Sequence, residues 1–188
     1  MKPIYNTVVT ALKSKGWTLS LARVNIIGMR QKEKVLDTYN DYICIAYIDQ
    51  RSRWIFKAFP ATTLPGKYWL VDKLINPKGT LILSPGRYVG AFELGKHKGK
   101  YEALVQAKPL PVYRDKNRDG IIDYENLETG MFGVNIHKRE GFSDFIGKNS
   151  AGCQVIKEQA DFEELITLCK QKGVKNPQKN FDYILLEY

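Results

Sequence analysis

Cysteine and histidine are both scarce in this sequence, which excludes most metal and disulfide frameworks. The 188 residues include 3 cysteines and 2 histidines. Cys44, Cys153 and Cys169 contain no Cys-x-x-Cys spacing, so neither a zinc ribbon nor a thioredoxin-type motif is expected. A chain of this length buries enough surface to fold without disulfides, and we expect a single domain over residues 1–188.

Long apolar runs are also missing. No stretch approaches the roughly 20 apolar residues that a membrane-spanning helix needs. Near the start, the polar residues Thr7, Thr10 and Lys13 interrupt the apolar ones, so no secretory signal peptide is expected. The sequence therefore predicts no membrane span and synthesis in the cytoplasm. If the protein acts outside the cell, we expect a route of export other than a signal peptide.

Acidic residues are fewer than basic ones, with 20 Asp and Glu against 29 Lys and Arg and a formal net charge of +9. Such a protein is attracted to polyanions, among which nucleic acid, an anionic bacterial envelope and acidic lipid are candidates. The basic residues are scattered along the chain, and neither a nucleic-acid-binding motif nor a phosphate-binding glycine loop with its lysine is present. We therefore expect no nucleic-acid partner, and we expect a monomer.

The hydrophobic pattern begins and ends with helical segments. Apolar residues at helical spacing favour a short helix over residues 4–15 that ends at Gly16, although the valines and threonines there also suit a strand. Near the end of the chain, a second apolar stripe predicts a helix over residues 157–172 that Gly173 terminates.

Between these helices the sequence pattern predicts short strands separated by turn signals such as Pro65-Gly66 and Asn76-Pro77-Lys78-Gly79. Many short strands at close intervals are typical of antiparallel β-sandwiches and barrels. We therefore expect a mainly β fold with a short N-terminal helix and one C-terminal helix. The expected strands cover residues 23–30, 42–48, 53–59, 68–71, 80–83, 88–94, 101–107, 110–114, 132–137 and 181–186.

The segment from His137 to Cys153 contains the parts that cysteine catalysis needs. A strand ends in His137, a polar loop follows, and Cys153 stands behind a turn of small residues. A thiol is mostly protonated at neutral pH, and a nearby imidazole can convert it to the nucleophilic thiolate. The backbone N–H groups of Gly152 and Cys153 are candidates for stabilising an oxyanion, and Ser150 is a candidate for orienting His137 or the turn. The structural alternative is a small buried cysteine and an unrelated histidine.

The order histidine, loop, Ser-x-Gly-Cys resembles the catalytic segment of the YkuD-type L,D-transpeptidases, bacterial enzymes that remodel the stem peptides of peptidoglycan. His137 matches the family's first histidine, and Ser150, Gly152 and Cys153 match its second block. The resemblance covers residues 131–156. It implies a β domain of L,D-transpeptidase type, a cysteine acyl-enzyme, a peptidoglycan stem peptide as substrate and no cofactor for catalysis.

Two positions depart from the family pattern. Ala151 stands where the family has a second histidine, and Gln154 follows the cysteine where an arginine is usual. The Asn-Ile-His and Ser-Ala-Gly-Cys-Gln forms also resemble phage-associated relatives of the family. That resemblance implies action at the cell wall after delivery by a phage or after release, which agrees with the absence of a signal peptide.

Four further residues are candidates for binding substrate. His97 lies in a lysine-rich stretch and is expected to contact substrate or to orient His137, whereas a solvated basic turn is the alternative. Arg114 is expected to replace the missing arginine as a clamp for a carboxylate. The complete set of predicted substrate-binding residues is His97, Tyr101, Gln106 and Arg114.

Residues 115–123 follow the pattern Asp-x-Asn-x-Asp-Gly-x-x-Asp, which resembles a calcium-binding loop. Oxygen side chains at alternate positions and a glycine at the sixth position suit a structural calcium ion. The twelfth position is Asn126 instead of a glutamate, and an Asx-rich turn is the alternative. The predicted ligands are Asp115, Asn117, Asp119 and Asp123.

Three functions from different classes follow from these features. The first is a cysteine transferase or peptidase that acts on peptidoglycan stem peptides. The second is a non-catalytic, β-rich module that binds the cell wall or belongs to a virion, and the third is a calcium-stabilised binding protein. The surroundings of Cys153 separate the first two, because a catalytic thiol must line an open groove near His137, whereas a structural thiol is sealed in the core.

Overall fold

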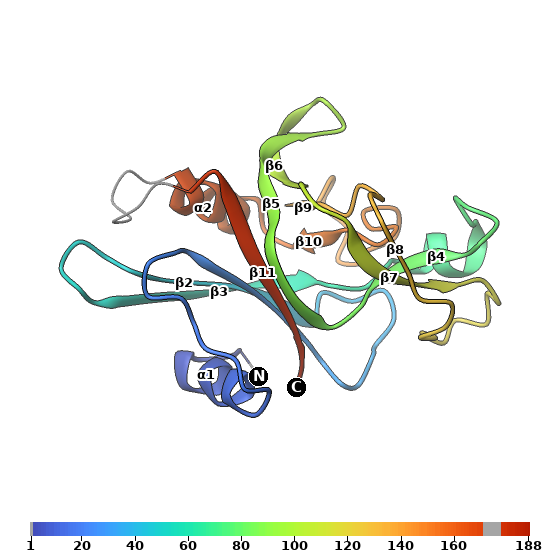
Figure 1. The fold of residues 1–188 in the computed structure, drawn as a ribbon. Helices are drawn as coiled ribbons and strands as arrows, with labels where there is room; N and C mark the ends of the chain where they lie inside the picture. The colour runs from blue at the N-terminus through green and yellow to red at the C-terminus, as the bar shows by residue number, and fades with distance from the viewer. Residues whose placement is uncertain (1, 171–177) are drawn as a thin grey trace.

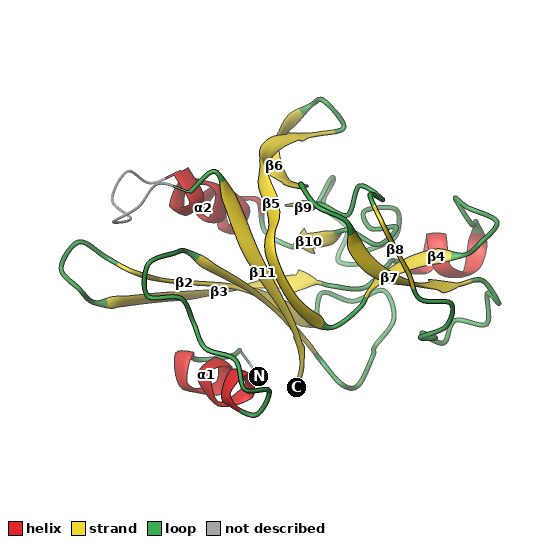
Figure 2. Cartoon of the chain, in the orientation of Figure 1, coloured by secondary structure: helices red, strands yellow, loops and turns green. Residues whose placement is uncertain are grey.

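The computed structural model describes residues 2–170 and 178–188, and β-strands make up most of it (Figures 1 and 2). One group of strands is β1 (Asn25–Arg30), β2 (Asp41–Ile48), β3 (Trp54–Thr62), β5 (Gly86–His97), β6 (Tyr101–Gln106), β9 (Ile136–Lys138), β10 (Gln154–Ile156) and β11 (Asn180–Glu187). These strands form a closed barrel in the order β1-β11-β5-β6-β9-β10-β3-β2. A separate sheet consists of β4 (Thr80–Leu83), β7 (Leu110–Asp115) and β8 (Glu128–Gly130). The prediction of a mainly β protein is confirmed.

Strand direction departs from the purely antiparallel arrangement that the sequence predicts. Strand β11 runs parallel to β1, and β10 runs parallel to β9, while the other paired strands are antiparallel. The pairing of β1 with β11 brings residues from the two ends of the chain together and closes the barrel. Strands β9 and β10 can be parallel because the loop of residues 139–153 is long enough to bring the chain back to the level at which β9 begins.

The two predicted helices are present and cover different faces of the barrel. Helix α1 (Tyr5–Lys13) buries Val8 and Leu12 against outward-facing side chains of β1 and β2, including Cys44. Gly16 follows it with φ +69°, a conformation that favours glycine and ends the helix. Helix α2 (Gln159–Lys170) packs an apolar face, with Cys169, against the main core. Gly173, the expected end of this helix, lies outside the described residues.

The helices of the described residues are all short. None of them is both long enough and apolar enough to cross a membrane. Helix α2 lies at one end of the barrel, and the separate sheet lies at the other (Figure 1).

Residues 68–71, predicted as a strand, instead begin the single helical turn η1 (Tyr68–Asp72). The backbone N–H groups of Trp69 and Leu70 both donate to the Gly66 carbonyl, at 3.1 and 3.2 Å. The apolar residues suit a strand, but Pro65-Gly66 starts a turn whose local hydrogen bonds satisfy the backbone before a neighbouring strand can. Leu70 is fully buried, so the turn still contributes to the core.

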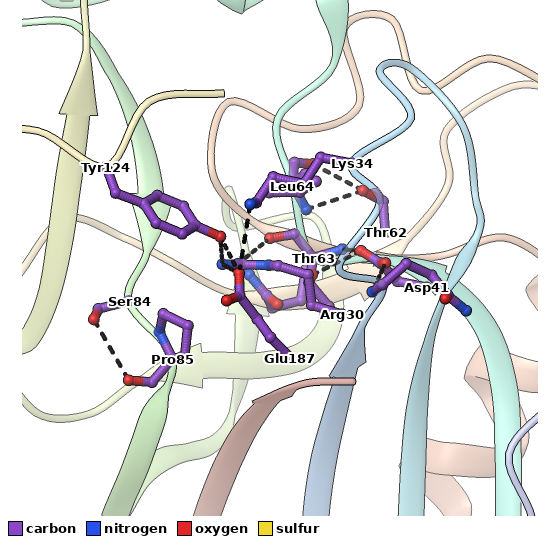
Figure 3. Close-up of polar contacts among 12 residues, drawn as sticks. Arg30, Lys34, Asp41, Thr62, Thr63, Leu64, Ser84, Pro85, Tyr124 and Glu187 are labelled. Carbon is purple, nitrogen blue, oxygen red and sulfur yellow. Dashed lines mark hydrogen bonds and ion pairs between the residues drawn. The ribbon is translucent and has the colours of Figure 1, made fainter. Parts of the chain in front are cut away.

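A buried arginine joins the end of β1 to the loops around it (Figure 3). Arg30 is 0% exposed, and its Nε and Nη2 donate to Thr63 Oγ1 and to the Thr63 carbonyl at 2.9 and 2.8 Å. Its Nη1 donates to the Tyr124 hydroxyl at 3.2 Å and lies 3.8 Å from Glu187 Oε1. Because a buried charge is costly without partners, this set of contacts fixes residues 63 and 124 against the barrel.

Candidate active site

A cavity of about 450 Å³ lies between the barrel and the separate sheet. Its walls come from the β5–β6 turn, the residues before β9 and β10, and strands β4 and β7. Cys153 and His97 both line it, and Lys98 and Arg114 are the charged residues among the described side chains of its wall. The residues that line the cavity include Leu81, His97, Lys98, Arg114, Asn135 and Cys153.

The turn before Cys153 is held by Ser150. The buried Ser150 hydroxyl donates to the Cys153 carbonyl at 2.7 Å and accepts the Gly152 N–H at 3.2 Å. The Ser150 carbonyl accepts the Gly66 N–H at 2.9 Å. Of the two roles expected for Ser150, the structure therefore favours orienting the turn, since its hydroxyl does not contact His137.

The same hydrogen bond corrects the expected set of oxyanion donors. The Gly152 N–H is engaged by Ser150 Oγ and is not free to bind an oxyanion. Within the described part of the chain, the Cys153 N–H donates to no acceptor. Cys153 N–H is therefore the backbone donor that remains available beside the thiol. Gly152 serves the site in another way, because its φ of +126° and its close approach to Leu81 let the chain turn at this point.

Cys153 is the accessible thiol of the three. It is partly exposed and its Sγ lies 3.5 Å from the Gly133 carbonyl, whereas Cys44 and Cys169 are buried. Burial raises the pKa of the Cys153 thiol, while the backbone N–H of Asn135 and the charge of Lys98 offset part of this effect. Burial raises the pKa of Cys169 to about 12, so that thiol is inert at neutral pH.

Strand pairing places Cys153 and His137 on one face. In the parallel pair of β9 and β10, His137 lies beside Val155. Cys153 is two residues before Val155, so its side chain points to the same face of the strand pair as Val155 and His137. In the described structure no hydrogen bond yet joins Cys153 Sγ to either imidazole. The strand register therefore puts the thiol and His137 on one face, and no hydrogen bond joins them among the described residues.

The two histidines stack on each other in the barrel wall. Their ring centroids are 4.0 Å apart with an interplanar angle of 20°, and both rings are almost fully buried. His137 Nδ1 lies 2.8 Å from the Lys138 carbonyl, which can only accept, so Nδ1 carries the proton. Nε2 of His137 therefore has the free lone pair, as in a general base.

His97 has the opposite tautomer. Asn135 Oδ1 accepts the backbone N–H of Gln106 at 3.0 Å, which fixes the Asn135 amide so that its Nδ2 faces His97 Nδ1 at 3.0 Å. Nδ2 can only donate, so His97 Nδ1 accepts and Nε2 carries the proton. Among the described residues, His97 Nε2 has no hydrogen-bond partner. The pair thus supplies one acceptor, on His137, and one donor, on His97.

Both histidines are neutral at pH 7. Burial, with a smaller effect of the neighbouring His97, lowers the pKa of His137 to about 3. Burial also lowers the pKa of His97, with Lys98 acting in the same direction. The sequence-based expectation that a nearby imidazole converts the Cys153 thiol to the thiolate therefore does not describe the resting protein. The Cys153 thiol and both histidines are neutral there.

Two of the predicted substrate-binding residues do not line the cavity. Tyr101 is absent from its wall, and its hydroxyl lies 3.3 Å from His137 Nδ1. Gln106 is buried, and its amide binds the carbonyls of Lys108 and Gly130 and the N–H groups of Phe132 and Val134. Its prediction as a substrate ligand is wrong, because its polar atoms are used to fix the loop before β9.

Arg114 does line the cavity. Its Nε pairs with Glu128, its Nη1 donates to the Gly79 carbonyl at 3.1 Å, and its guanidinium carbon lies 5.1 Å from the centre of the Phe132 ring. These contacts hold the side chain in place. In the described structure Nη2 has no protein partner, so Arg114 can still donate to a carboxylate in the cavity.

The predicted calcium ligands lie apart from this cavity, in the loop after β7. Asn117 Nδ2 is 2.7 Å from Asp123 Oδ2 and 3.1 Å from Asp119 Oδ2. Asp115 Oδ2 accepts the Asp123 N–H at 3.0 Å. In residues 2–170 and 178–188, no three His, Cys, Asp or Glu side chains are already gathered around one point that a metal ion would occupy.

Two residues of the site were not predicted from the sequence. Asn135 fixes the tautomer of His97, and Lys98 lines the cavity beside His97. The spacing of Asn135 and His137 in Asn-Ile-His places both side chains on one face of a strand, which is the signal that could have identified Asn135. Lys98 gave no such signal, since it is one of several lysines in its stretch of sequence.

The buried neutral histidines predict a loss of stability in mild acid. A histidine whose pKa falls from 6.5 in the unfolded chain to about 3 in the fold binds its proton first in the unfolded state. Stability is therefore complete above pH 6.5 and declines as the pH falls toward 3, by up to about 1.4 kcal/mol per pH unit for each such histidine. Urea denaturation of wild type and His137→Gln at pH 7, 6 and 5 measures this slope.

The pH range from 7 to 5 distinguishes the effect of the histidines on stability from that of the ion-paired carboxylates. The pKa values of Glu128 and Asp144 are lowered by Arg114 and Lys157 respectively, so their pairs are lost only below about pH 4.5. The slope between pH 7 and 5 should be smaller in His137→Gln than in wild type. Equal slopes would show that His137 is not held neutral in the fold.

Comparison with known proteins finds no family model, no curated protein and no solved structure that matches the chain.

Proposed function

We propose that the protein is a cysteine-dependent acyl transferase or hydrolase of L,D-transpeptidase type that acts on peptidoglycan stem peptides. The observation that carries the proposal is the position of Cys153. Its thiol lines an open cavity and points to the same strand face as His137, whose Nε2 has a free lone pair. The resemblance of residues 131–156 to the YkuD-type catalytic segment supplies the substrate class.

In this mechanism Cys153 Sγ attacks the acyl carbon of a peptide bond. The thiol proton passes to Nε2 of His137 as the S–C bond forms, which gives a tetrahedral intermediate with an anionic oxygen, and this intermediate then collapses to the thioester. The proton then passes to the leaving amine as the peptide bond breaks. An amine acceptor or a water molecule next attacks the thioester, which gives transfer or hydrolysis and restores the thiol. His137 Nδ1 stays bonded to the Lys138 carbonyl throughout, which keeps the ring orientation fixed.

Two donors are available for the developing oxyanion and the substrate. The Cys153 N–H is adjacent to the reacting sulfur, as an oxyanion donor must be. The buried Nε2–H of His97 lacks a partner in the described structure and belongs to a residue of the cavity wall, so a shift of the ring toward the cavity would let it donate to a substrate carbonyl. His97 is therefore proposed as a substrate-binding residue and not as the base.

The charges of the cavity suit a substrate that carries carboxylates. Lys98 and Arg114 line the wall, and no aspartate or glutamate of the described residues accompanies them there. Arg114 takes the role of the arginine that Gln154 replaces, with Nη2 directed to a substrate carboxylate and with Glu128 and Gly79 holding it in place. The +9 charge of the chain also favours residence on an anionic cell wall, where we propose that the protein acts.

The alternative of a non-catalytic module receives less support from the geometry. A structural cysteine is expected to be sealed among apolar side chains, as Cys44 and Cys169 are. Cys153 instead is partly exposed at a cavity wall beside polar groups. A module also has no need for two buried histidines in complementary tautomers.

The decisive experiment incubates the purified chain with muropeptides, with and without an added amine acceptor, and identifies the products by mass spectrometry. We expect new products from wild type and from Cys44→Ala, which removes a buried thiol, and none from Cys153→Ala. An acyl-enzyme should add the mass of the stem fragment to the peptide that contains Cys153. Absence of products from wild type, or products that persist in Cys153→Ala, would overturn the proposal.

A further inference from the structure

The loop between β7 and Tyr124 is a separate feature that the proposed chemistry does not use. Oxygen-bearing side chains occupy its alternate positions 115, 117 and 119, and Asp123 follows. Gly120 between them has φ +82°, so the chain makes the sharp turn that such a loop requires. The Asn117 amide nitrogen lies between two carboxylates, 2.7 Å from Asp123 Oδ2 and 3.1 Å from Asp119 Oδ2. A positively polarised group thus already bridges these carboxylates.

Asp115 provides an independent sign that the loop binds a cation. Its side chain belongs to a residue that is 1% exposed, and its Oδ1 has no hydrogen-bond partner among the described residues. Its Oδ2 is directed to the loop, where it accepts the Asp123 N–H at 3.0 Å. A buried carboxylate oxygen without a donor is costly, and a cation would remove that cost.

We propose that residues 115–123 bind a calcium ion through the side-chain oxygens of Asp115, Asn117, Asp119 and Asp123. All four donors are oxygen atoms, which hard cations prefer, and none is nitrogen or sulfur. Rotation of the Asn117 amide would break the 3.2 Å hydrogen bond from the Asp119 N–H and would present Oδ1 in place of Nδ2, so that a cation replaces the amide nitrogen between Asp119 and Asp123. Calcium fits better than magnesium, because an irregular loop tolerates the flexible coordination that calcium accepts.

The loop is anchored at several points to the rest of the protein. Arg118 donates to the carbonyls of Val71 and Asp72 at 2.7 and 2.8 Å, so its charge points to the η1 turn. At the other end, the Tyr124 hydroxyl contacts Arg30 and Glu187 in the buried cluster (Figure 3). A cation would therefore bind to a loop whose ends are already fixed, which reduces the entropy lost on binding.

The site also adjoins the wall of the proposed active site. Asp115 is the last residue of β7, and Arg114 immediately before it lines the cavity. A Cβ on Gly79 would lie 2.4 Å from the Asp115 carbonyl oxygen, so the chain of the cavity wall packs directly on the loop. Calcium binding is therefore expected to stabilise the β4-β7-β8 sheet, whatever reaction the cavity performs.

The test measures thermal unfolding of the full chain in EDTA, in CaCl₂ and in MgCl₂, together with terbium luminescence excited through tyrosine. At a calcium concentration about 100 times the dissociation constant, the melting temperature should rise by about 5–10 °C. Terbium should luminesce when bound, because Tyr124 is adjacent to Asp123, and calcium should displace it. Asp119→Asn, on an exposed residue, should lose both effects, and Asp115→Asn should lose them as well.

Asp144→Asn is the matched control, because it removes an exposed aspartate outside the loop. It should keep the calcium-dependent shift. A melting temperature that is indifferent to calcium and EDTA would overturn the proposal, as would a shift that survives in Asp119→Asn. An equal shift with magnesium would overturn the assignment to calcium. None of these readouts depends on turnover of muropeptides, so failure here and failure of the proposed activity can be told apart.

Discussion

Replacing His137 by glutamine is expected to lower the rate of acyl transfer or hydrolysis by a factor of about 10² to 10⁴. This is the usual range for the loss of a general acid–base group. Glutamine keeps a polar amide at this buried position, but it has no imidazole nitrogen to receive the thiol proton. The comparison is of muropeptide turnover by wild type and His137→Gln across pH 5 to 9.

The variant set for this prediction must separate catalysis from stability. His137 is buried and stacked on His97, so His137→Ala is expected to leave a cavity and to cost about 2–3 kcal/mol of stability. The same substitution at an exposed strand end would cost less stability. His97→Gln should raise KM more than it lowers kcat, because His97 binds substrate. Wild-type turnover by His137→Gln, or a larger loss of kcat in His97→Gln, would remove His137 as the base.

The fold was predictable where local patterns decide it. Runs of apolar and aromatic residues separated by a polar loop predicted β2 and β3 within three residues at each end, and apolar residues at helical spacing followed by Gly16 predicted α1 and its end. Strand direction was not predictable, because the parallel pairs β1–β11 and β9–β10 join segments that are far apart or separated by a long loop. Strand β8 was missed because its three residues, Glu-Thr-Gly, carry no apolar alternation, and its pairing depends on β7.

The candidate site was likewise predictable in its local features and not in those that depend on distant residues. The sequence placed Cys153 and His137 in one segment, and the strand register does bring their side chains to one face. The tautomers could not be predicted, since they depend on the Lys138 carbonyl for His137 and on Asn135 for His97. Arg114 was predicted only because the sequence lacks an arginine after Cys153. In the structure it reaches the cavity from another sheet.

Gly152 connects the turn of the site to the packing of the separate sheet, and Gly152→Ala is expected to cost about 3 kcal/mol of stability. A φ of +126° strains any residue with a Cβ, by about 1–3 kcal/mol. The added Cβ would also lie 2.6 Å from Leu81 Cβ and 2.8 Å from the Leu81 carbonyl oxygen. Because one of these atoms belongs to the backbone of β4, a change of side-chain rotamer cannot relieve the contact, and overpacking adds about 1–3 kcal/mol. Chemical denaturation of the variant measures the loss.

Gly141→Ala is the control that isolates the contact with Leu81. Gly141 also has a positive φ, of +80°, but a Cβ there would meet no atom within 4 Å. It should therefore cost only the backbone strain, about 1 kcal/mol. If the variant Gly152→Ala folds, its turn must move away from β4, so Cys153 should become more accessible to iodoacetamide while muropeptide turnover falls. Equal losses of stability in the two variants would show that Gly152 is required for its conformation alone, and that β4 does not press on the turn that presents Cys153.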